Sequence, residues 1–368
     1  MNVLLLTDHF YPDMSSGGRL LTDLALGLVN SGYKVQVVTA YASYNTTETG
    51  LPKEEFWGVD IERVRYAKVN RENITGRLIN ELLFCFTLFW RCFLHKKIDV
   101  IITLSSPPLL PCFVLLLSRI KKVPYIYLVM DIFPDIAVKL GIATPNTPLI
   151  KTWDFLSNLA LRKALRIVVL GRCMFKVIKD KLGNKEVPID IICNWSSSKL
   201  MKPISREENI FFKKHPSLKE KFIVQYSGNL GRFQEFEIIL EAAEKIKTNP
   251  SIHFLIIGEG VQREWLFNEV ARRDLENVTL LPFQPQDDLV YSLNAADIAL
   301  VTLKRGAEGL GVPSKFYPIL AVGKAVVAVM GEWAEVALVV KESEIGIVLE
   351  QSDSDGLVEA IQQLLDHP

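Results

Sequence analysis

Short runs of β-branched and aliphatic residues alternate with helix-length segments along this chain, and the alternation occurs once in each half. This pattern is typical of parallel sheets that are covered by helices on both faces. The strands expected in the first half are Val3–Thr7, Lys34–Thr39, Val100–Thr103, Tyr125–Val129, Arg166–Val169 and Ile189–Cys193. Those expected in the second half are Phe222–Ser227, His253–Ile257, Val278–Leu281, Ile298–Thr302, Ala325–Val329 and Gly346–Leu349. We therefore expect an α/β protein with two doubly wound parallel sheets.

Helix-length segments fill the gaps between these strands, and the 368 residues suit two domains of about 100–200 residues each. The polar, Lys-rich stretch Ser196–Lys221, punctuated by prolines, is expected to be the linker. We accordingly predict domains over residues 1–200 and 201–368. The expected helices include Leu20–Ser31, Phe236–Lys247, Arg263–Arg273, Asp288–Ala295, Lys315–Ala321 and Gly356–Leu365.

The chain carries 42 basic and 42 acidic residues, but the two halves have opposite charge. Residues 1–200 hold 25 basic and 17 acidic side chains, a balance of +8, and residues 201–368 balance at −8. A basic half suits an anionic lipid, a phosphorylated substrate or the acidic half itself, and composition does not choose among these. Nucleic acid is not an expected partner, because no basic stripe interleaved with stacking aromatics is visible.

Cysteine usage and the first residues both favour a reducing compartment. The five cysteines are scattered and form no CxxC pair, so buried free thiols are expected. The opening MNVLLLTDHF has no basic n-region and no small-residue cleavage site, and it resembles a first strand instead of a secretory signal. We expect a cytoplasmic protein.

Two apolar stretches, Leu82–Leu94 and Leu109–Leu117, are too short to cross a membrane, which needs about 20 apolar residues. Residues 61–97 hold eight basic side chains against three acidic ones, and the first stretch is rich in Phe and Trp. This combination suits a helix lying on an anionic membrane surface. A core helix with solvated polar ends fits equally well, and both interpretations stay open here.

Ligands bind at the carboxyl ends of parallel strands, so the loops that follow the expected strands are the candidate sites. After the first strand, Gly17 and Gly18 lie at a strand-to-helix turn, where exposed amides and a helix N-terminus favour an anion. A glycine turn needed only for the connection is an equally simple interpretation.

The second half repeats this arrangement without a dinucleotide fingerprint. Gly228 and Gly231 follow the strand in FIVQYSGNLG, and Gly258 and Gly260 follow the next strand, but neither segment has the complete GxGxxG spacing. A dehydrogenase is therefore not expected.

The segment Glu308 to Lys315, EGLGVPSK, precedes an expected helix and combines a carboxylate, two glycines and a lysine. Helix-end amides and a lysine can hold a diphosphate while a glutamate accepts hydrogen bonds from sugar hydroxyls. These residue types are also ordinary punctuation at a helix start. Asp131 follows the strand YIYLVM and is either a ligand contact or a turn cap. Asp353 and Asp355 resemble a metal-binding DxD but begin the last helix, where a capping aspartate is common.

Together, these motifs resemble family 4 of the glycosyltransferases. The matching segments are the Gly17-Gly18 loop, DIFPD, Asn194-Trp195, SGNLGRFQ, IIGEG, Ala296-Asp297 and VPSKFYPILAVGK, spread over nearly the whole chain. The sequence is similar to a bacterial branch that builds O-antigen, capsule and exopolysaccharide, including transferases of N-acetylfucosamine-like sugars. The resemblance implies a GT-B fold, in which two Rossmann-like domains face each other across a cleft.

The resemblance also assigns roles to individual residues. Gly17 and Gly18 would lie near the donor phosphates and the acceptor, and Asp131 would contact the reacting sugar or the acceptor hydroxyl. Glu308 would be the first acid of the family's acidic pair, while Pro318 takes the place of the second, for which Glu335 is the expected substitute. The implied catalytic residues are Asp131 and Glu308, and the implied donor-binding residues are Gly17, Gly18, Asn229, Arg232, Gln234, Gly258, Glu259, Gly309, Gly311, Lys315 and Glu335.

The sequence departs from its relatives at several of these positions. Asn229 and Gln234 stand where many relatives have the Arg and Lys that clamp the diphosphate, so the leaving group must depend on Lys315, Arg232 or helix-end amides. Met130 replaces a His of many relatives. Relatives usually continue into a helix that crosses back onto the first domain, and the ending LLDHP is not expected to form it.

The implied activity is a retaining transfer, of the hexosyl or N-acetylhexosaminyl type, from a UDP- or GDP-linked sugar to a polyprenyl-diphosphate-linked sugar or glycan. No cofactor and no obligatory metal are implied, and the implied location is the inner face of the plasma membrane. Two alternatives remain: a sugar-nucleotide epimerase of the same fold and a non-catalytic binding partner.

Overall fold

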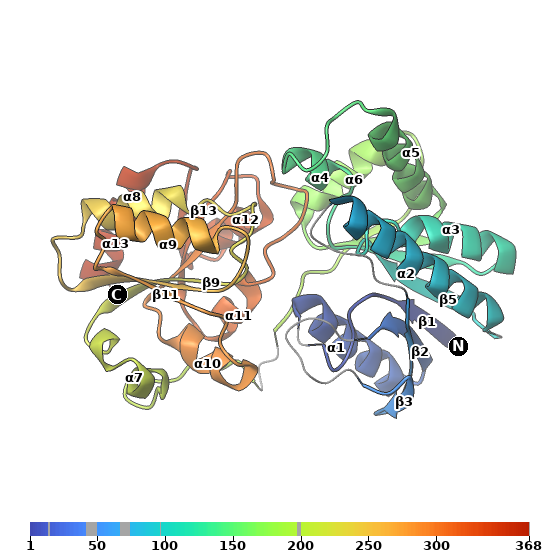
Figure 1. The fold of residues 1–368 in the computed structure, drawn as a ribbon, viewed down its shortest axis with the longest axis horizontal. Helices are drawn as coiled ribbons and strands as arrows, with labels where there is room; N and C mark the ends of the chain where they lie inside the picture. Colours follow the sequence, from blue (N-terminus) through green and yellow to red (C-terminus); the bar gives the residue numbers. More distant parts are fainter. Residues whose placement is uncertain (14, 42–49, 67–73, 96, 197–199, 368) are drawn as a thin grey trace. The chain divides into compact units, whose positions relative to one another are not determined.

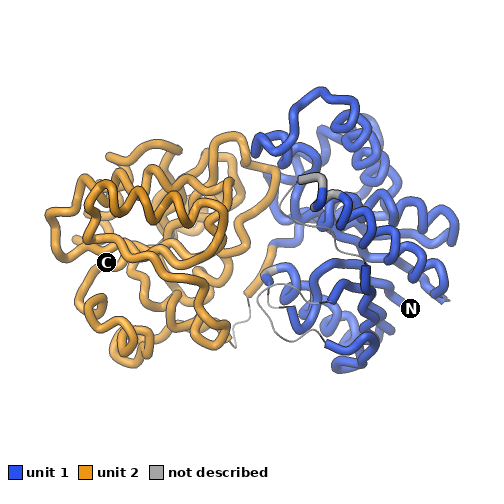
Figure 2. Tube along the Cα trace, in the orientation of Figure 1, with its two compact units in different colours: residues 1–193 blue, residues 194–368 orange. Residues whose placement is uncertain are grey.

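The computed structural model describes residues 1–13, 15–41, 50–66, 74–95, 97–196 and 200–367. The chain divides into two compact units, residues 1–193 and 194–368 (Figures 1 and 2). Each unit is built on one largely or wholly parallel sheet, so the expected α/β class with two parallel-sheet domains is confirmed. All the strands expected from the sequence are present, with bounds shifted by at most two residues.

The sheet of unit 1 has, within the described residues, the order β3-β4-β2-β1-β5-β6-β7-β8. Its neighbours pair in parallel except at the β3–β4 hairpin, and Leu5 on the central strand β1 lies opposite both Val37 and Ile102. The strands are β1 (Asn2–Leu6), β2 (Lys34–Ala40), β3 (Lys53–Phe56), β4 (Val59–Val64), β5 (Val100–Leu104), β6 (Tyr125–Val129), β7 (Arg166–Val169) and β8 (Ile189–Ile191).

Helices cover both faces of this sheet because successive side chains of a strand point to opposite sides. Val3 and Leu5 belong to a core that includes Leu21 and Ala25 of α1. The helices α2 and α3 pack against each other, and α3 also packs on β5 and β6. The helices of unit 1 are α1 (Ser16–Asn30), α2 (Ile74–Leu94), α3 (Leu110–Lys121), α4 (Asp135–Lys139), α5 (Pro148–Lys163) and α6 (Arg172–Leu182).

The hairpin β3–β4 was not expected from the sequence, and it holds a buried arginine. The Arg63 guanidinium donates to the carbonyl oxygens of Leu51 (2.7 Å) and Tyr11 (2.5 Å) and pairs with Glu54 at 2.6 Å. The Tyr11 ring stacks on Phe56 with centroids 3.8 Å apart. The hairpin therefore fixes the backbone of the loop that follows β1.

The sheet of unit 2 is parallel throughout, with the order β11-β10-β9-β12-β13-β14 within the described residues. The strands are β9 (Phe222–Ser227), β10 (Ile252–Ile257), β11 (Val278–Leu281), β12 (Ile298–Thr302), β13 (Ala325–Val329) and β14 (Gly346–Leu349). The helical segments are α7 (Phe211–Lys214), the 3₁₀ helix Pro216–Leu218, α8 (Glu237–Lys245), α9 (Arg263–Arg272), α10 (Gln286–Asn294), α11 (Phe316–Ala321), α12 (Glu335–Glu342) and α13 (Ser354–Asp366).

The interpretation of 196–221 as a linker is wrong. Phe211, Phe212 and Leu218 are buried in a core cluster with Ile223 and Leu255. The sequence pattern misses this because two short helical turns separated by proline leave no helical periodicity to detect. The boundary between the units lies after Cys193, a few residues before the one expected at residue 200.

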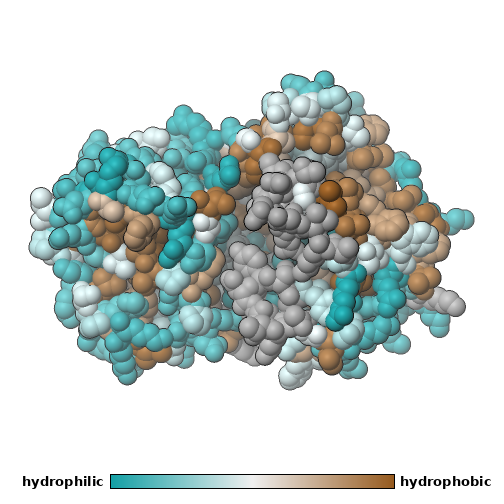
Figure 3. All heavy atoms as spheres, in the orientation of Figure 1, coloured by the Kyte–Doolittle hydropathy of each residue, from teal (hydrophilic) through white to brown (hydrophobic). Residues whose placement is uncertain are grey.

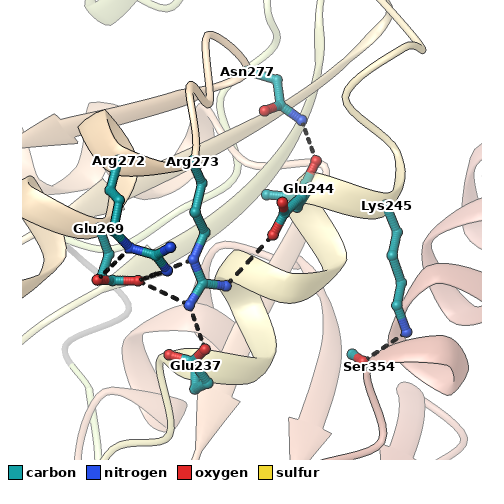
Figure 4. Close-up of polar contacts among 9 residues, drawn as sticks. Glu237, Glu244, Lys245, Glu269, Arg272, Arg273, Asn277 and Ser354 are labelled. Atoms are coloured by element: carbon teal, nitrogen blue, oxygen red, sulfur yellow. Dashed lines mark hydrogen bonds and ion pairs between the residues drawn. The ribbon is translucent and has the colours of Figure 1, made fainter.

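A buried arginine network joins α8 to the end of α9 (Figure 4). Arg273 follows α9, and its guanidinium contacts three carboxylates, those of Glu237, Glu244 and Glu269. Because this guanidinium is 8% exposed, its charge needs these partners. The network fixes α8 and α9 over the same face of the sheet.

Within the described ranges, no helix combines the length and the apolar character that crossing a bilayer requires. All five cysteines carry free thiols, as expected, but only three of them are buried, since Cys112 is half-buried and Cys193 is exposed. The capping role expected for Asp353 is confirmed, because its carboxylate accepts the Gly356 amide at 2.9 Å.

Gly258 is a position where only glycine fits. Its φ is +156°, and a Cβ there would lie 1.9 Å from the Gly228 carbonyl oxygen. We expect Gly258→Ala to destabilise the chain by about 3 kcal/mol, since both the backbone conformation and the backbone contact oppose a side chain. The measurement is the urea midpoint followed by circular dichroism.

Gly27→Ala is the matched control, because a Cβ at this position in α1 meets nothing within 4 Å. Alanine should leave stability within about 1 kcal/mol of the wild type or raise it. Equal urea midpoints for the two variants would contradict the close contact at Gly258.

Candidate functional site

In both sheets the chain reverses its direction of winding at one place, and the loops at such a switch point form a natural crevice. In unit 1 the reversal lies between β1 and β5, and in unit 2 it lies between β9 and β12. The candidate residues of unit 2 follow β9, β10, β12 and β13, and Asp131 of unit 1 follows β6. The sequence therefore placed its candidates at the correct edge of each sheet.

The glycine loops after β9 and β10 contact each other closely. The Leu230 amide donates to the Glu259 carbonyl at 2.8 Å, and a Cβ at Gly260 would lie 2.4 Å from the Leu230 carbonyl. The Glu259 carboxylate pairs with Arg263 at 3.2 Å. Gly258 and Gly260 thus allow the two backbones to meet, which is a structural reason for glycine at both positions.

Lys315 places a buried amine nitrogen at the switch point of unit 2. Its Nζ lies 3.5 Å from the centroid of the Tyr226 ring and has no hydrogen-bond partner. A Cβ on Gly228 would lie 2.9 Å from the same Nζ, so glycine there leaves space for the lysine. Burial lowers the pKa of Lys315 well below its usual value. Burial therefore disfavours the charged form of this amine, and the aromatic face compensates for that only in part.

Gln234 provides a second buried polar atom without a hydrogen-bond partner, its Oε1. The loop around it is fixed from outside, because Gln262 Nε2 donates to the carbonyls of Gly231 and Gln234. Rotation of the Gln234 amide by half a turn would present its NH₂ in place of the oxygen. Asn229 and Arg232 of the same loop are exposed.

Glu308 is buried (5% exposed), and its carboxylate already accepts three hydrogen bonds within unit 2. The donors are the Gly306 amide at 2.5 Å, the Gly331 amide at 3.2 Å and Gln351 Nε2 at 2.7 Å. The carboxylate therefore connects the loop after β12 to the loop after β13. This bracing was not apparent from the sequence, because its partners lie 2, 23 and 43 residues away.

The remaining candidates of unit 2 lie on the loop after β12 and at the start of α12. Gly309 is buried with φ +76°, and Gly311 follows it at half exposure. Glu335 is buried and begins α12, and Pro318 lies inside α11. A carboxylate at the start of α12 is favoured by the exposed amides of the helix end.

In unit 1, the loop before α1 is organised by hydrogen bonds. The Ser15 side chain caps α1 by accepting the Gly18 amide at 3.1 Å, and Asp13 accepts the Ser15 amide at 2.9 Å. A Cβ on Gly18 would lie 2.5 Å from the Asp13 carbonyl, whereas one on Gly17 would meet nothing within 4 Å. The two glycines are thus not equivalent: Gly18 is required by packing, and Gly17 is not.

The sequence interpretation missed a cluster of titratable groups at the same loop. His9 Nδ1 lies 2.8 Å from the buried Asp13 carboxylate, and His9 Nε2 lies 3.4 Å from Asp8. Burial alone would lower the pKa of His9, but the hydrogen bond with Asp13 and the two negative charges outweigh it and raise that pKa. Glu81 of α2 is also affected, since burial and the Asp8 charge raise its pKa to about 7. The dipeptide Asp8-His9 directly after a strand was the available signal.

Asp131 lies where its strand predicted, at the end of β6. Its amide and that of Met130 both donate to the Ser105 hydroxyl, each at 2.9 Å, so the end of β5 fixes this turn. Burial raises the pKa of Asp131 to about 6. The second aspartate of DIFPD, Asp135, instead pairs with Lys181 at 2.8 Å.

The described part of the chain contains no group of three His, Cys, Asp or Glu side chains close enough to hold a metal ion.

Replacing Asp13 by asparagine should lower the pKa of His9 to about its ordinary 6.5 or below, because the carboxylate is what outweighs burial. The raised pKa means that protonated His9 stabilises the native chain below the unfolded pKa, and this stabilisation is lost as pH rises through the folded-state pKa. NMR titration of the imidazole and melting temperatures at about pH 5.5 and 8 test this.

The control is Asp60→Asn on the exposed part of β4. It should keep the wild-type titration of His9 and the wild-type change in melting temperature over that pH range. An unchanged His9 pKa in Asp13→Asn would contradict the coupling.

Both parts of the chain match family models. Residues 17–195 match the glycosyl transferase 4-like domain, and residues 207–368 match glycosyl transferases group 1. The chain is similar to the probable glycosyltransferase WbjE of Pseudomonas aeruginosa, with 31% identity over 84% of this chain and 76% of that protein. It is 24% identical to WcaI of Escherichia coli K12, a putative colanic acid biosynthesis glycosyl transferase, over 99% of this chain and 92% of WcaI.

Solved structures agree on the fold. Sucrose-phosphate synthase from Thermosynechococcus elongatus superposes with a TM-score of 0.79 at 17% identity, over all of this chain and 90% of that one. Anabaena HepE in complex with UDP-glucose gives a TM-score of 0.72 at 17% identity with the same coverage. With the two sheets, their switch-point loops and the family matches in agreement, the chain belongs to the group 1, family 4 glycosyltransferases and has their GT-B fold.

Proposed function

We propose that this glycosyltransferase transfers a sugar, with retention of anomeric configuration, from a nucleoside diphosphate sugar to a lipid-linked or glycan acceptor in surface polysaccharide biosynthesis. The observation that carries the donor half of this proposal is the buried, unpartnered ammonium of Lys315. The name of WcaI, which refers to colanic acid biosynthesis, supports the polysaccharide half.

A buried cation without an ion pair costs several kcal/mol, and a cation–π contact returns about 2 kcal/mol of it. Such a group persists in a binding site when a ligand supplies the missing countercharge. A diphosphate at the switch point of unit 2 would do so, because it could accept from Lys315 Nζ and from loop amides together. We infer that Lys315 is the principal contact of the leaving group.

Neighbouring side chains can share this role in place of the Arg and Lys of many relatives. Arg232 is exposed on the β9 loop, and Gln234 can turn its amide to donate. Asn229 lies on the same loop. Asn229 and Gln234 can give only hydrogen bonds, and Arg232 adds one exposed charge. We therefore assign most of the electrostatic stabilisation of the diphosphate to Lys315.

We propose that the donor sugar is linked to UDP. HepE, whose fold this chain shares, was solved with UDP-glucose, which supports a UDP-linked donor over a GDP-linked one. Gly309, Gly311 and Glu335 lie on the loops after β12 and β13, where we propose that the sugar and ribose are held. Glu308 would then act by fixing these loops, since its carboxylate is already occupied.

For the acceptor, we propose unit 1, with Asp131 accepting the hydrogen bond of the attacking hydroxyl. Catalysis would be mainly positioning together with stabilisation of the leaving diphosphate and the developing positive charge on the sugar. Neither role requires a metal ion, and we propose a transfer that does not depend on one. The lipid-linked acceptor would bring the protein to the inner face of the plasma membrane.

UDP and its sugars should raise the melting temperature of the purified protein, and EDTA should not reduce the shift. A ligand that binds only the folded state stabilises it by about 2.7 kcal/mol at a hundred times its Kd. The panel is UDP, GDP, dTDP and their sugars. No shift with any of them would contradict the proposed donor class, and a shift that EDTA abolishes would contradict the metal-independent part.

Lys315→Met should raise the melting temperature of the nucleotide-free protein and remove most of the shift with UDP. A methionine of similar length avoids the desolvation cost of the ammonium, about 1–3 kcal/mol, but offers nothing to a diphosphate. Lys304→Met is the matched control, because Lys304 is exposed on the same β12 loop and should change stability by less than about 0.5 kcal/mol. A wild-type shift in Lys315→Met would show that the diphosphate lies elsewhere.

A sugar-nucleotide epimerase of the same fold is the alternative enzyme. It would convert the donor sugar without any acceptor, so chromatography of the donor after incubation alone distinguishes the two activities. Formation of the epimer without acceptor would show that the enzyme catalyses epimerisation and not transfer.

A further inference from the structure

The helix α2 has two apolar faces, and only one of them packs on the sheet. Its inner face buries Phe84, Cys85, Leu88 and Cys92. A second stripe, spaced three or four residues apart, faces solvent: Ile79, Leu82, Phe86, Trp90 and Phe93, with exposures between 39% and 54%. An ordinary surface helix would carry polar side chains along this second stripe.

The neighbouring helix α3 extends this apolar surface. Phe113 of α3 contacts Phe89 of α2 at a centroid distance of 6.4 Å, and Lys121 Nζ lies 5.5 Å from the centre of the Phe93 ring. Exposed Leu116 and Ile120 lie one turn apart on α3, each 49% exposed. Figure 3 shows hydrophobic residues gathered over the part of unit 1 where Figure 1 draws α2 and α3. We name as the α2–α3 face the residues Leu82, Phe86, Trp90, Phe93, Leu94, Leu116 and Ile120.

Basic side chains border one end of this face. Both helices carry basic residues in their last turn, Arg91 in α2 and Arg119 and Lys121 in α3. The two ends lie together, because Lys121 Nζ donates to the His95 carbonyl at 2.7 Å. Lys97 and Lys122 follow directly and are exposed. Two acidic residues lie nearby: Glu62 is buried and pairs with Arg91, and the exposed Asp99 accepts hydrogen bonds from Asn2.

Aromatic and leucine side chains beside a cationic rim fit a bilayer surface that carries negative charge. The apolar stripe would enter the boundary between headgroups and acyl chains, and the basic residues near the surface would be attracted to anionic lipid. A second copy of the chain fits this face less well, since the residues of the face offer no carboxylate to pair with the cationic rim of a partner.

We propose that the α2–α3 face docks unit 1 on an anionic phospholipid surface. This deepens the proposed function, because a lipid-linked acceptor would lie in the same membrane. The docking rests on the proposed function only in that the acceptor explains why the protein would bind a membrane. The docking itself needs no nucleotide, so it can fail or succeed independently of donor binding.

Co-sedimentation with vesicles of phosphatidylcholine alone, or of phosphatidylcholine with phosphatidylglycerol, tests the proposal. The wild-type protein should bind the anionic vesicles and release from them as salt is raised. The double variant Phe86→Ser, Trp90→Ser should bind the vesicles at least about tenfold more weakly than the wild type, because both side chains are half exposed on the face. Arg119→Gln with Lys122→Gln should reduce binding to anionic vesicles and flatten its salt dependence.

Phe267→Ser is the matched control, since Phe267 is 65% exposed on α9 of unit 2. It should bind vesicles as the wild type does. Melting temperatures and the UDP-induced shift of every variant establish that each is folded, and the UDP shift reports on donor binding separately.

Three results would overturn the proposal. They are equal binding of wild type and Phe86→Ser, Trp90→Ser, equal binding to neutral and anionic vesicles, and absence of vesicle binding by the folded wild-type protein. In the last case, a dimer in sedimentation equilibrium that the same double variant dissociates would assign the face to a second copy.

Discussion

The pairing of β9 with two neighbours, β10 and β12, is the constraint on which the candidate site of unit 2 depends. It brings together three loops that are distant in sequence. Gly258 can then lie against the Gly228 carbonyl, and Lys315, which begins the turn into α11, reaches the Tyr226 ring beside Gly228. Gly228 takes part in the first contact and lies beside the second. A change in the register of β9 would separate all of these groups at once.

The buried ammonium of Lys315 illustrates how stability and binding oppose each other at such a site. In the ligand-free chain burial lowers the pKa of Lys315, because the tyrosine face only partly offsets the desolvation of the charged form. Glu308 shows the opposite solution, because its buried carboxylate receives three hydrogen bonds from its own unit. One titratable group is therefore satisfied by hydrogen bonds within its own unit, and the other has no hydrogen-bond partner there.

In unit 1, the β3–β4 hairpin holds the loop that carries candidate residues after β1. Arg63 of β4 holds the Tyr11 carbonyl, and the loop that includes Tyr11 leads to Asp13, which orients both His9 and the Ser15 cap of α1. The same unit carries the aromatic and basic α2–α3 face. A loop with fixed titratable groups and a surface suited to lipid thus belong to one unit, which fits a protein that meets an acceptor held in a membrane.

The sequence by itself determined the parallel sheets, nearly all strand bounds and the loops that carry the candidate residues, because short continuous apolar runs and glycine turns are local signals. It also determined the family, through motifs such as VPSKFYPILAVGK. Only the tertiary structure decided that 211–218 belongs to a core, that the β3–β4 hairpin supports the β1 loop, and that Glu308 is braced while Lys315 is unpartnered. It also separated the buried face of α2 from the exposed one. These outcomes depend on contacts between residues far apart in the chain, which no local pattern encodes.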